Sequence, residues 1–368
     1  MFERRLYFHV DWLLLGAILI LAGIGVAEIY STTYLQTATG GHSGTQPVTQ
    51  LYALGIGLVA LLVCLMVDYR VFAEHSLFVY GSVVVLLIFV LFKGSTQMGA
   101  QRWIPLGPFH LQPSEFARIA VALILAMYFG ENRRGAKNTG DLIIGGILTC
   151  VPLLLIAKQP DLGTAVTLLP VFVGVAFLAG LRLRLLGVLA LAAILVAPVA
   201  WKFGLKDYQR QRIQTFLDPE QDPRGAGYQT IQARVTVGSG GLIGKGFRNG
   251  TQGQYKFLPV AHNDFIFSVL AEEEGFVGIL TALGLYLFVI LRSLEAARLA
   301  KDRLGAYLVG GIISGFAFQV IYNVSMSAGL APVKGITLPL MSYGGSSLIA
   351  SLAGFGLILN VRMRRFTN

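Results

Sequence analysis

Ten long apolar segments constrain this chain more than any other feature of its sequence. They run near residues 11–33, 50–68, 76–92, 114–130, 141–157, 164–180, 186–201, 264–291, 306–328 and 343–361. A membrane-spanning helix needs about 20 apolar residues, so each segment is close to spanning length. Only 13% of the 368 residues are charged, against about 25% in a typical soluble domain. The sequence therefore predicts an all-α polytopic membrane protein of about ten transmembrane helices, and it argues against disorder and against an ordinary soluble enzyme.

The distribution of positive charge predicts the orientation. Arg4 and Arg5 precede the first apolar segment, which is too long for a signal peptide and lacks a small-residue cleavage site, so we interpret it as a retained span. With both termini assigned to the cytoplasm, fifteen Lys and Arg residues lie in cytoplasmic segments and four in the short outer loops. We attribute the net charge of +10 first to this excess of Lys and Arg on the cytoplasmic side and second to attraction to anionic membrane lipid. We do not attribute it to nucleic-acid binding.

One long polar loop, residues 202–262, interrupts a chain that we otherwise treat as a single transmembrane domain over 1–368. It lies between the seventh and eighth segments and is predicted to be extracytoplasmic. Apolar residues at helical spacing, such as Ile213, Phe216 and Ile231, Val235, predict short helices on the membrane surface. The glycine-rich run 238–246 could approach phosphates through its backbone N–H groups, but it is not a Walker A motif.

The same loop is rich in basic residues. This suits an anionic substrate such as a lipid pyrophosphate, and contact with anionic lipid headgroups is an alternative of similar weight. The cations are Lys202, Lys206, Arg210, Arg212, Arg224, Arg234, Lys245, Arg248 and Lys256.

Ionisable residues inside apolar segments are costly, and they are the first candidates for a functional site. Pro113 and Ser114 predict the start of the fourth helix, and Glu115 and Arg118 are three residues apart on its same face, so they can pair. The alternative is an ion pair that only orients the helix.

The start of the eighth segment carries a second group. Asp264 stands at its outer mouth, where a partly desolvated carboxylate could act as a general base or could simply cap the helix. Glu272, Glu273 and Glu274 lie about two turns deeper, and at least one must face the bundle interior. The alternative for Glu273 or Glu274 is an aqueous cavity or a pair with Arg118. A third group, Lys158 and Asp161, sits in a short outer loop whose Pro and Gly also fit a simple turn.

Five stretches of the chain match motifs of a known family: Gln112–Glu115, Lys158–Thr164, Asp218–Gln229, His262–Phe267 and Gly329–Ser347. With these motifs in this order, the chain resembles the SEDS family (shape, elongation, division and sporulation), the group of RodA, FtsW and SpoVE. The resemblance covers nearly the whole chain, and details such as Gly250-Thr251-Gln252 look more like the RodA branch than the FtsW branch. Two positions depart from the family: Arg118 stands where Lys is usual, and Asn263 where Thr is usual.

The resemblance implies a peptidoglycan glycosyltransferase of the bacterial inner membrane that polymerises Lipid II on the outer face. Asp264 matches the family's essential carboxylate, Glu115 and Arg118 its buried acid–base pair, and Asp161 a second important outer carboxylate. We expect Asp264 to be the base of an inverting transfer. Further residues are expected to contact the substrate or its pyrophosphate: Glu115, Arg118, Lys158, Asp161, Arg212, Lys245 and Glu272.

The resemblance also implies partners, namely a class B penicillin-binding protein and the rod-elongation complex. No ligand spacing requires a cofactor; a divalent cation, Mg²⁺ or Mn²⁺, held by a carboxylate is a further hypothesis. Two other functions stay open at this point. One is a flippase that moves the lipid-linked precursor across the bilayer, and the other is a noncatalytic scaffold for the penicillin-binding protein.

Overall fold

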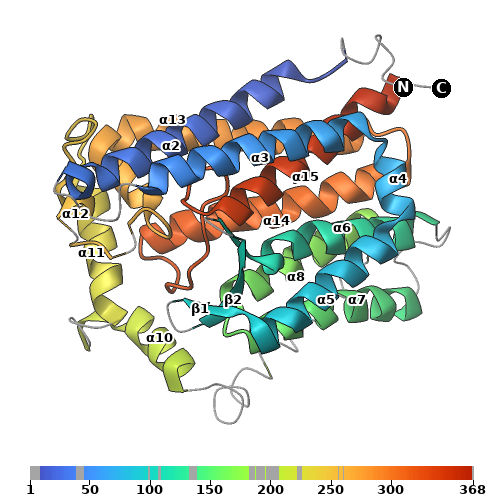
Figure 1. Cartoon of the computed structure of the whole chain (residues 1–368), viewed down its shortest axis with the longest axis horizontal. Helices are drawn as coiled ribbons and strands as arrows, with labels where there is room; N and C mark the ends of the chain where they lie inside the picture. Colours follow the sequence, from blue (N-terminus) through green and yellow to red (C-terminus); the bar gives the residue numbers. More distant parts are fainter. Residues whose placement is uncertain are drawn as a thin grey trace.

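A computed structural model describes residues 9–38, 45–97, 100–106, 109–131, 139–181, 187, 195, 207–221, 226–255, 257–259 and 261–366. Long helices run side by side along the long axis of the molecule (Figure 1). The helices over the spans and their connections are α2 (Trp12–Ala38), α3 (Gln46–Met66), α4 (Tyr69–Glu74), α5 (Ser76–Lys93), α6 (Pro113–Glu131), α7 (Thr139–Lys158), α8 (Leu162–Leu178), α13 (Ile266–Arg298), α14 (Arg303–Ser327), α15 (Gly345–Met363) and the 3-10 helix η5 (Arg364–Phe366).

Nine of the ten predicted segments are helices in the described part of the chain. Eight helices are long and apolar enough to cross a membrane, and α8 is an apolar helix of 17 residues. The remaining predicted segment, 186–201, lies outside the described residues apart from 187 and 195, so the total of ten stays a prediction. α6 begins at Pro113, as predicted from the pattern around Ser114.

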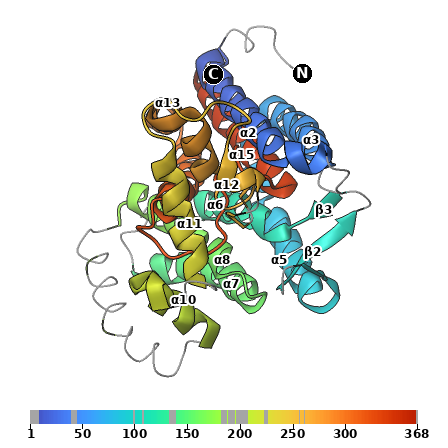
Figure 2. The same ribbon diagram turned by 90° about the vertical axis from the view of Figure 1, so that its left-hand side faces the viewer.

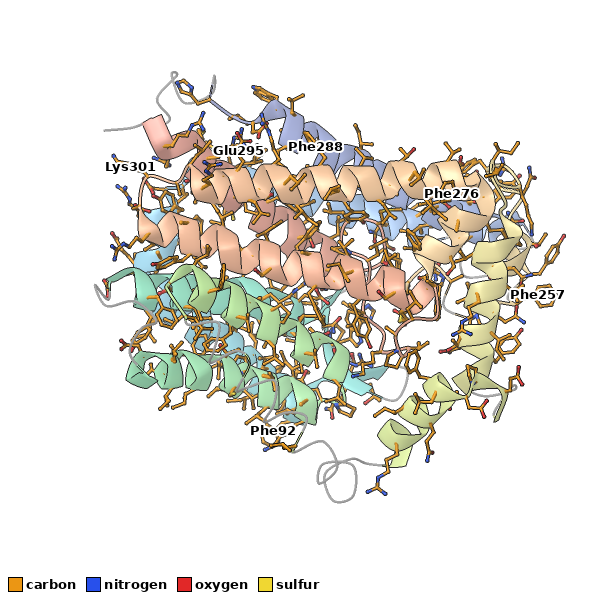
Figure 3. The ribbon with its side chains drawn as sticks, turned by 180° about the vertical axis from the view of Figure 1, so that it is seen from behind. Phe92, Phe257, Phe276, Phe288, Glu295 and Lys301 are labelled. Carbon is orange, nitrogen blue, oxygen red and sulfur yellow. The ribbon has the colours of Figure 1, made fainter. Side chains whose placement is uncertain are left out.

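Three helices form the centre of the bundle. In α15, α14 and α6, 89%, 61% and 72% of the apolar stretch is buried inside the protein, against 22% in α5. α5 and α13 instead present large apolar side chains outward, including Phe92, Phe276 and Phe288 (Figure 3). A continuous apolar exterior of this kind is expected when lipid rather than water is the solvent, because lipid tails leave no penalty for exposed Phe.

The prediction of an all-α fold did not include a small β-sheet, which the structure contains between α5 and α6. The strands β1 (Ser95–Gln97), β2 (Ala100–Leu106) and β3 (Phe109–Leu111) pair antiparallel in the order β1-β2-β3. Ile104 pairs with Leu111 in the β2–β3 ladder. The end of β3 is fixed to the start of α15, because Ser346 Oγ donates to the carbonyl of His110 and accepts from the N–H of Gln112.

The described part of the long loop folds at one end of the bundle, and the start of α2 and the end of α15 lie at the other (Figure 1). It contains α10 (Asp207–Leu217), the 3-10 helix η4 (Pro219–Gln221), α11 (Ala226–Ser239) and α12 (Thr251–Gln254), which confirms the predicted helices. Figure 2 looks onto this end, with α10 and α11 in front of the bundle. We call it the loop end of the molecule.

A break in α13 anchors the glycine-rich run of the loop. Gly275 adopts φ +65° inside α13, a conformation that glycine reaches without a steric cost. The N–H of Lys245 donates to the carbonyl of Glu272, and the N–H of Gly246 donates to the carbonyl of Glu273. In return, the N–H of Phe276 donates to the carbonyl of Gly241. The N–H groups of Lys245 and Gly246 therefore hold the loop to α13. The hypothesis that they bind a phosphate is wrong for these two groups.

Candidate active site

Asp264 lies in a tight turn at the loop end, directly before α13. The turn is held from two sides: Tyr343 N–H donates to the carbonyl of His262 at 2.9 Å, and Asn323 Nδ2 donates to the carbonyl of Asp264 at 2.8 Å. The N-cap position of α13 belongs to Phe265, one residue after Asp264, and the Phe265 side chain makes no capping hydrogen bond. The Asp264 side chain is half-buried, as the partial desolvation of a general base requires.

The segment Lys334–Ile336 brings Asp264 and Asp161 to the same part of the loop end. Gly335 has no side chain, and a Cβ atom at this position would lie only 3.5 Å from Oδ2 of Asp264. The backbone of Gly335 therefore faces that carboxylate directly. On its other side the segment touches the start of α8, where a Cβ at Gly163 would lie 2.5 Å from the carbonyl oxygen of Lys334. Gly335 itself has φ +64°, which favours glycine at this position.

Asp161 is the buried N-cap of α8 and the centre of a polar cluster. Its Oδ1 accepts from the N–H of Thr164 at 3.2 Å, and its Oδ2 accepts from Gln112 at 3.1 Å. Arg102 of β2 pairs with the same Oδ2 at 3.3 Å, so the small sheet supplies a cation to this carboxylate. Lys158 is exposed at the end of α7, one short turn away.

The predicted pair of Glu115 and Arg118 is present in the bundle interior. Nη2 of Arg118 lies 2.5 Å from Oε2 of Glu115, and Nη1 donates to Gln319 of α14. Both charged residues are nine-tenths buried or more. This excludes the alternative in which Arg118 pairs with Glu273 or Glu274. A cavity of about 30 Å³ beside the pair is large enough for a buried water.

One polar face of α14 links this buried pair to the Asp264 turn. Gln319 contacts Arg118, and Asn323, one turn further, donates both to Asp264 and to the carbonyl of Ile336 at 2.7 Å. Sequence reasoning missed both residues. The sequence did carry a signal for them, because two amides one turn apart inside an apolar span are costly unless they are hydrogen-bonded.

Glu272 and Lys245 are brought together, but in a tight anchor of the loop. Lys245 Nζ lies 2.6 Å from Oε1 of Glu272, which also accepts from the N–H of Thr251 at 3.0 Å. Glu272 is fully buried and Glu273 nearly so, which confirms that at least one of the three glutamates faces inward, whereas Glu274 is exposed. Glu273 is held by Ser31 of α2 at 2.5 Å.

Two further expectations concern Arg212 and a metal. Arg212 belongs to α10, but its side chain lies outside the described part of the structure. Among the described residues, no group of three or more His, Cys, Asp or Glu side chains could hold a metal ion.

His262 should make stability depend on pH. Burial lowers the pKa of this histidine from 6.5 to about 4, because the charged imidazolium is desolvated beside the Tyr343 ring. Between these two values the unfolded chain binds a proton that the folded chain does not, so stability falls as pH drops from about 6.5 to about 4, by about 3 kcal/mol in full. We expect melting in detergent to show this slope, and the His262→Gln variant to lack that part of it; equal slopes would contradict the account.

Asn323 should be a positioning residue for Asp264. Asn323→Ala removes the donor to the buried carbonyl of Ile336, which costs about 1–3 kcal/mol, and the donor to the part-buried carbonyl of Asp264, which loosens the Asp264 turn. We expect a lower melting temperature together with a lower turnover rate at unchanged substrate affinity. Thr281→Ala is the control, because that exposed hydroxyl bonds only within its own helix. Wild-type turnover in Asn323→Ala would show that the turn does not need this clamp.

Comparison with known proteins places this geometry in a class of membrane proteins. The family model FTSW_RODA_SPOVE, described as "Cell cycle protein", matches residues 11–366. The chain therefore belongs to the FtsW/RodA/SpoVE family, the SEDS family that its motifs resemble, and that prediction is confirmed.

Individual relatives span almost the full chain. Peptidoglycan glycosyltransferase MrdB of Escherichia coli is 42% identical over 339 residues, which cover 92% of this chain and 90% of that protein. Peptidoglycan glycosyltransferase RodA of Treponema pallidum is 32% identical, with 96% and 98% covered.

Solved structures agree with the sequence comparison. A chain of a peptidoglycan synthase complex, studied for the coordination of polymerization and crosslinking, matches with a TM-score of 0.82 at 35% identity; the match covers 98% of this chain and 99% of that one. RodA of Thermus thermophilus matches with a TM-score of 0.72 at 30% identity, with 98% of each chain covered. The fold at this level is that of RodA, including the mostly helical bundle predicted from the apolar segments.

Proposed function

We propose that this chain is a peptidoglycan glycosyltransferase that polymerises Lipid II at the loop end of the molecule, for cell elongation and shape. The observation that carries the proposal is the half-buried Asp264 carboxylate, held in a clamped turn against the bare backbone of Gly335. The names of the curated relatives support the reaction class. On this proposal the protein sits in the bacterial inner membrane with both termini cytoplasmic and the loop end outside.

The reaction joins two lipid-linked disaccharides. The 4-hydroxyl oxygen of the acceptor glucosamine attacks muramyl C1 of the donor, the C1–oxygen bond to undecaprenyl pyrophosphate breaks, and a β-1,4 bond forms with inversion. Asp264 takes the hydroxyl proton as the new bond forms, which is the task of a general base in a single displacement. The pyrophosphate leaves with the electron pair of the broken bond and needs cations nearby.

The cations differ in how they can serve the leaving group. Arg118 and Lys245 each already neutralise a carboxylate, at 2.5 Å and 2.6 Å, so they act within fixed ion pairs. Lys158 is exposed beside the Asp161 cluster and is therefore better placed than Arg118 or Lys245 to meet a pyrophosphate. Arg102, held over Asp161 by the small sheet, is a cation that the sequence analysis did not select.

A class B penicillin-binding protein is the proposed partner, within a rod-elongation complex. The support is the structural match to a chain of a peptidoglycan synthase complex. Such a partner would crosslink the glycan strands as they leave the loop end.

The test separates polymerisation from transport and from scaffolding. Purified protein in detergent micelles is incubated with labelled Lipid II, its class B partner and a penicillin that blocks crosslinking, and the products are resolved on a gel. We expect a ladder of glycan strands that the partner alone does not make. Because micelles offer no bilayer to cross, a flippase or a scaffold would give no ladder, and that result with competent substrate would overturn the proposal.

A further inference from the structure

The glycine-rich run of the long loop carries two large apolar side chains at its tip. Leu242 and Ile243 are 73% and 82% exposed. Gly241 and Gly244 make the turn that presents them, and their φ values of +57° and +78° lie in the region that favours glycine. Two adjacent apolar side chains as exposed as these indicate an apolar neighbour rather than water.

Backbone hydrogen bonds hold this tip against α13, just after the break in that helix. The N–H of Phe276 donates to the carbonyl of Gly241 at 3.0 Å, and the N–H of Val277 donates to the carbonyl of Leu242 at 3.2 Å. Phe276 and Val277 also have exposed side chains. Together with Leu242 and Ile243 they make one apolar surface, which joins the tip to the outward face of α13.

The sequence of α13 indicates where the hydrocarbon layer of the membrane begins. From the exposed Glu274 to Arg292 the helix carries no charged residue, and this stretch is about 27 Å long at 1.5 Å per residue. The hydrocarbon core of a bilayer is about 30 Å thick, so the stretch fits it. Large side chains such as Phe288 point outward from it (Figure 3). Because Val277 lies inside this stretch, Leu242, which is bonded to Val277, lies at the same depth.

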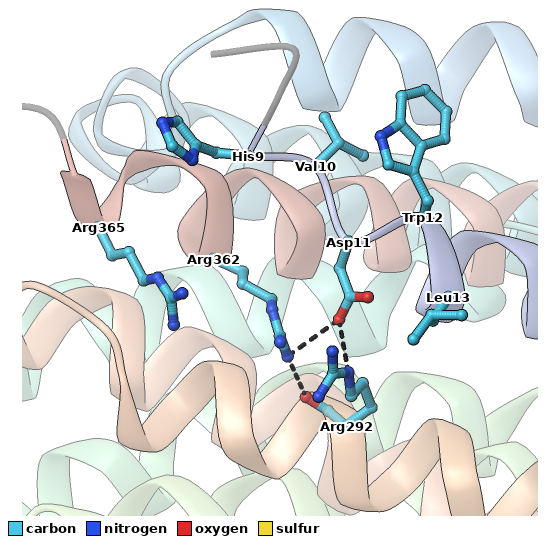
Figure 4. A pocket seen from close by; sticks show the side chains of 8 residues that line it. All are labelled: His9, Val10, Asp11, Trp12, Leu13, Arg292, Arg362 and Arg365. Carbon is cyan, nitrogen blue, oxygen red and sulfur yellow. Dashed lines mark hydrogen bonds and ion pairs between the residues drawn. The ribbon is translucent and has the colours of Figure 1, made fainter. Parts of the chain in front are cut away.

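The neighbouring helix α2 crosses the same layer. At one end of the stretch, Arg292 Nε lies 3.0 Å from Oδ2 of Asp11, directly before α2 (Figure 4). At the other end, Ser31 Oγ of α2 lies 2.5 Å from Oε1 of Glu273. The two helices therefore run antiparallel and in register over this stretch. Trp12 begins α2 at the edge opposite the tip, where tryptophan is typical of a membrane interface.

A cation and two tyrosines mark the headgroup level beside the tip. The guanidinium carbon of Arg248 lies 3.4 Å from the ring centre of Tyr34 and 6.0 Å from that of Tyr30. Tyr30 is exposed and precedes Ser31, the residue that meets Glu273. Tyrosines and cations are typical of the level where a span meets the headgroups. The run thus has apolar side chains at its tip and a cation on the side toward water.

We propose that the tip of the glycine-rich run inserts between the lipids of the leaflet at the loop end, with Leu242 and Ile243 among the outer parts of the acyl chains. The lipid-facing surface of α13 continues into the tip, which favours lipid as its neighbour. A turn can lie at this depth only when its polar backbone is bonded. The carbonyls of Gly241 and Leu242 are bonded to α13, and the N–H of Gly244 donates to Gly240 at 2.9 Å. This anchor ties the long loop to the membrane and does not depend on the proposed reaction.

The depth of the tip can be measured with a fluorescent probe on a single cysteine of the full chain in lipid vesicles. The two native cysteines, Cys64 and Cys150, are first replaced by alanine, and Ile243→Cys then carries the probe. We expect strong quenching by lipids that carry a nitroxide near the headgroup. Quenching by a nitroxide in the middle of the acyl chain should be weaker, and iodide in the water should quench little.

Two control positions calibrate the result. Gly284→Cys is the deep control, because this exposed glycine lies near the middle of the uncharged stretch and a Cβ there meets nothing within 4 Å. Asn249→Cys, exposed in the same loop, is the water control and should be quenched by iodide. Iodide quenching of Ile243→Cys as strong as that of Asn249→Cys would overturn the proposal. Shielding of Ile243→Cys only after the class B partner is added would assign the tip to that protein and would also overturn it.

A second pair of variants shows whether the loop, and not the probe, prefers lipid. With the probe on Leu242→Cys, the change Ile243→Asp should turn lipid quenching into iodide quenching, because a carboxylate is costly among acyl chains. Asn249→Asp adds the same charge to the same loop and should leave lipid quenching unchanged. Equal effects of the two changes, or no effect of Ile243→Asp, would contradict the assignment of a membrane anchor.

Discussion

Asp264→Asn should lower the rate of glycan polymerisation by about 10²–10⁴-fold, the usual contribution of a general base. The substitution keeps the shape of the side chain and the backbone carbonyl to which Asn323 donates, so the turn should persist. What is lost is the ability to accept the proton of the attacking hydroxyl. Initial rates of Lipid II consumption, with the melting temperature of each sample, measure the effect.

The matched control for Asp264→Asn is Glu220→Gln. Glu220 is an exposed carboxylate of η4 in the long loop that precedes Asp264, so its loss removes the same charge without touching the turn. We expect it to keep nearly wild-type activity. Equal losses in the two variants would mean that the loop needs negative charge in general rather than a base at Asp264.

Arg118→Met should be strongly destabilising. It leaves Glu115, a residue only 5% exposed, without its ion pair inside the bundle and also removes the contact to Gln319. Removing one partner of a buried pair costs about 3–5 kcal/mol, because the remaining charge stays desolvated. We expect this loss in the free energy of unfolding, measured by denaturant titration in detergent.

Two further variants separate the charge of Arg118 from its packing. The double variant Glu115→Gln, Arg118→Met removes both charges and should recover much of the lost stability. Arg118→Lys keeps the charge and should cost far less than Arg118→Met. A double variant as unstable as Arg118→Met would show that the packing of Arg118, and not its pairing with Glu115, stabilises this region.

The features that the sequence predicted are local ones. Apolar length alone marks a span, and the spacing of three residues on a helix places Glu115 beside Arg118. Helical spacing in the long loop likewise predicted α10 and α11. The family motifs then pointed to Asp264 and Asp161, although which residues hold them in place could not be read from the motifs.

The features that the sequence did not predict depend on contacts between distant parts of the chain. The approach of Gly335 to Asp264 and the pairing of Arg102 with Asp161 join segments with no shared periodicity. The strands β1 and β3 have only three residues each, too few for an alternating pattern. The glycine-rich run around Gly244 allowed an interpretation as a phosphate-binding loop, but the N–H groups of Lys245 and Gly246 are bonded to carbonyls of the distant helix α13.

The most direct test of the central claim, that the Asp264 carboxylate takes the proton of the attacking hydroxyl, is the pH dependence of kcat/KM for Lipid II polymerisation. It is measured for the wild type and for Asp264→Asn over the range in which both stay folded. We predict that the wild-type rate falls toward acid as the carboxylate is protonated, and that the small residual rate of Asp264→Asn lacks this acid limb. An Asp264→Asn variant with a wild-type rate, or with the same acid limb, would contradict the claim.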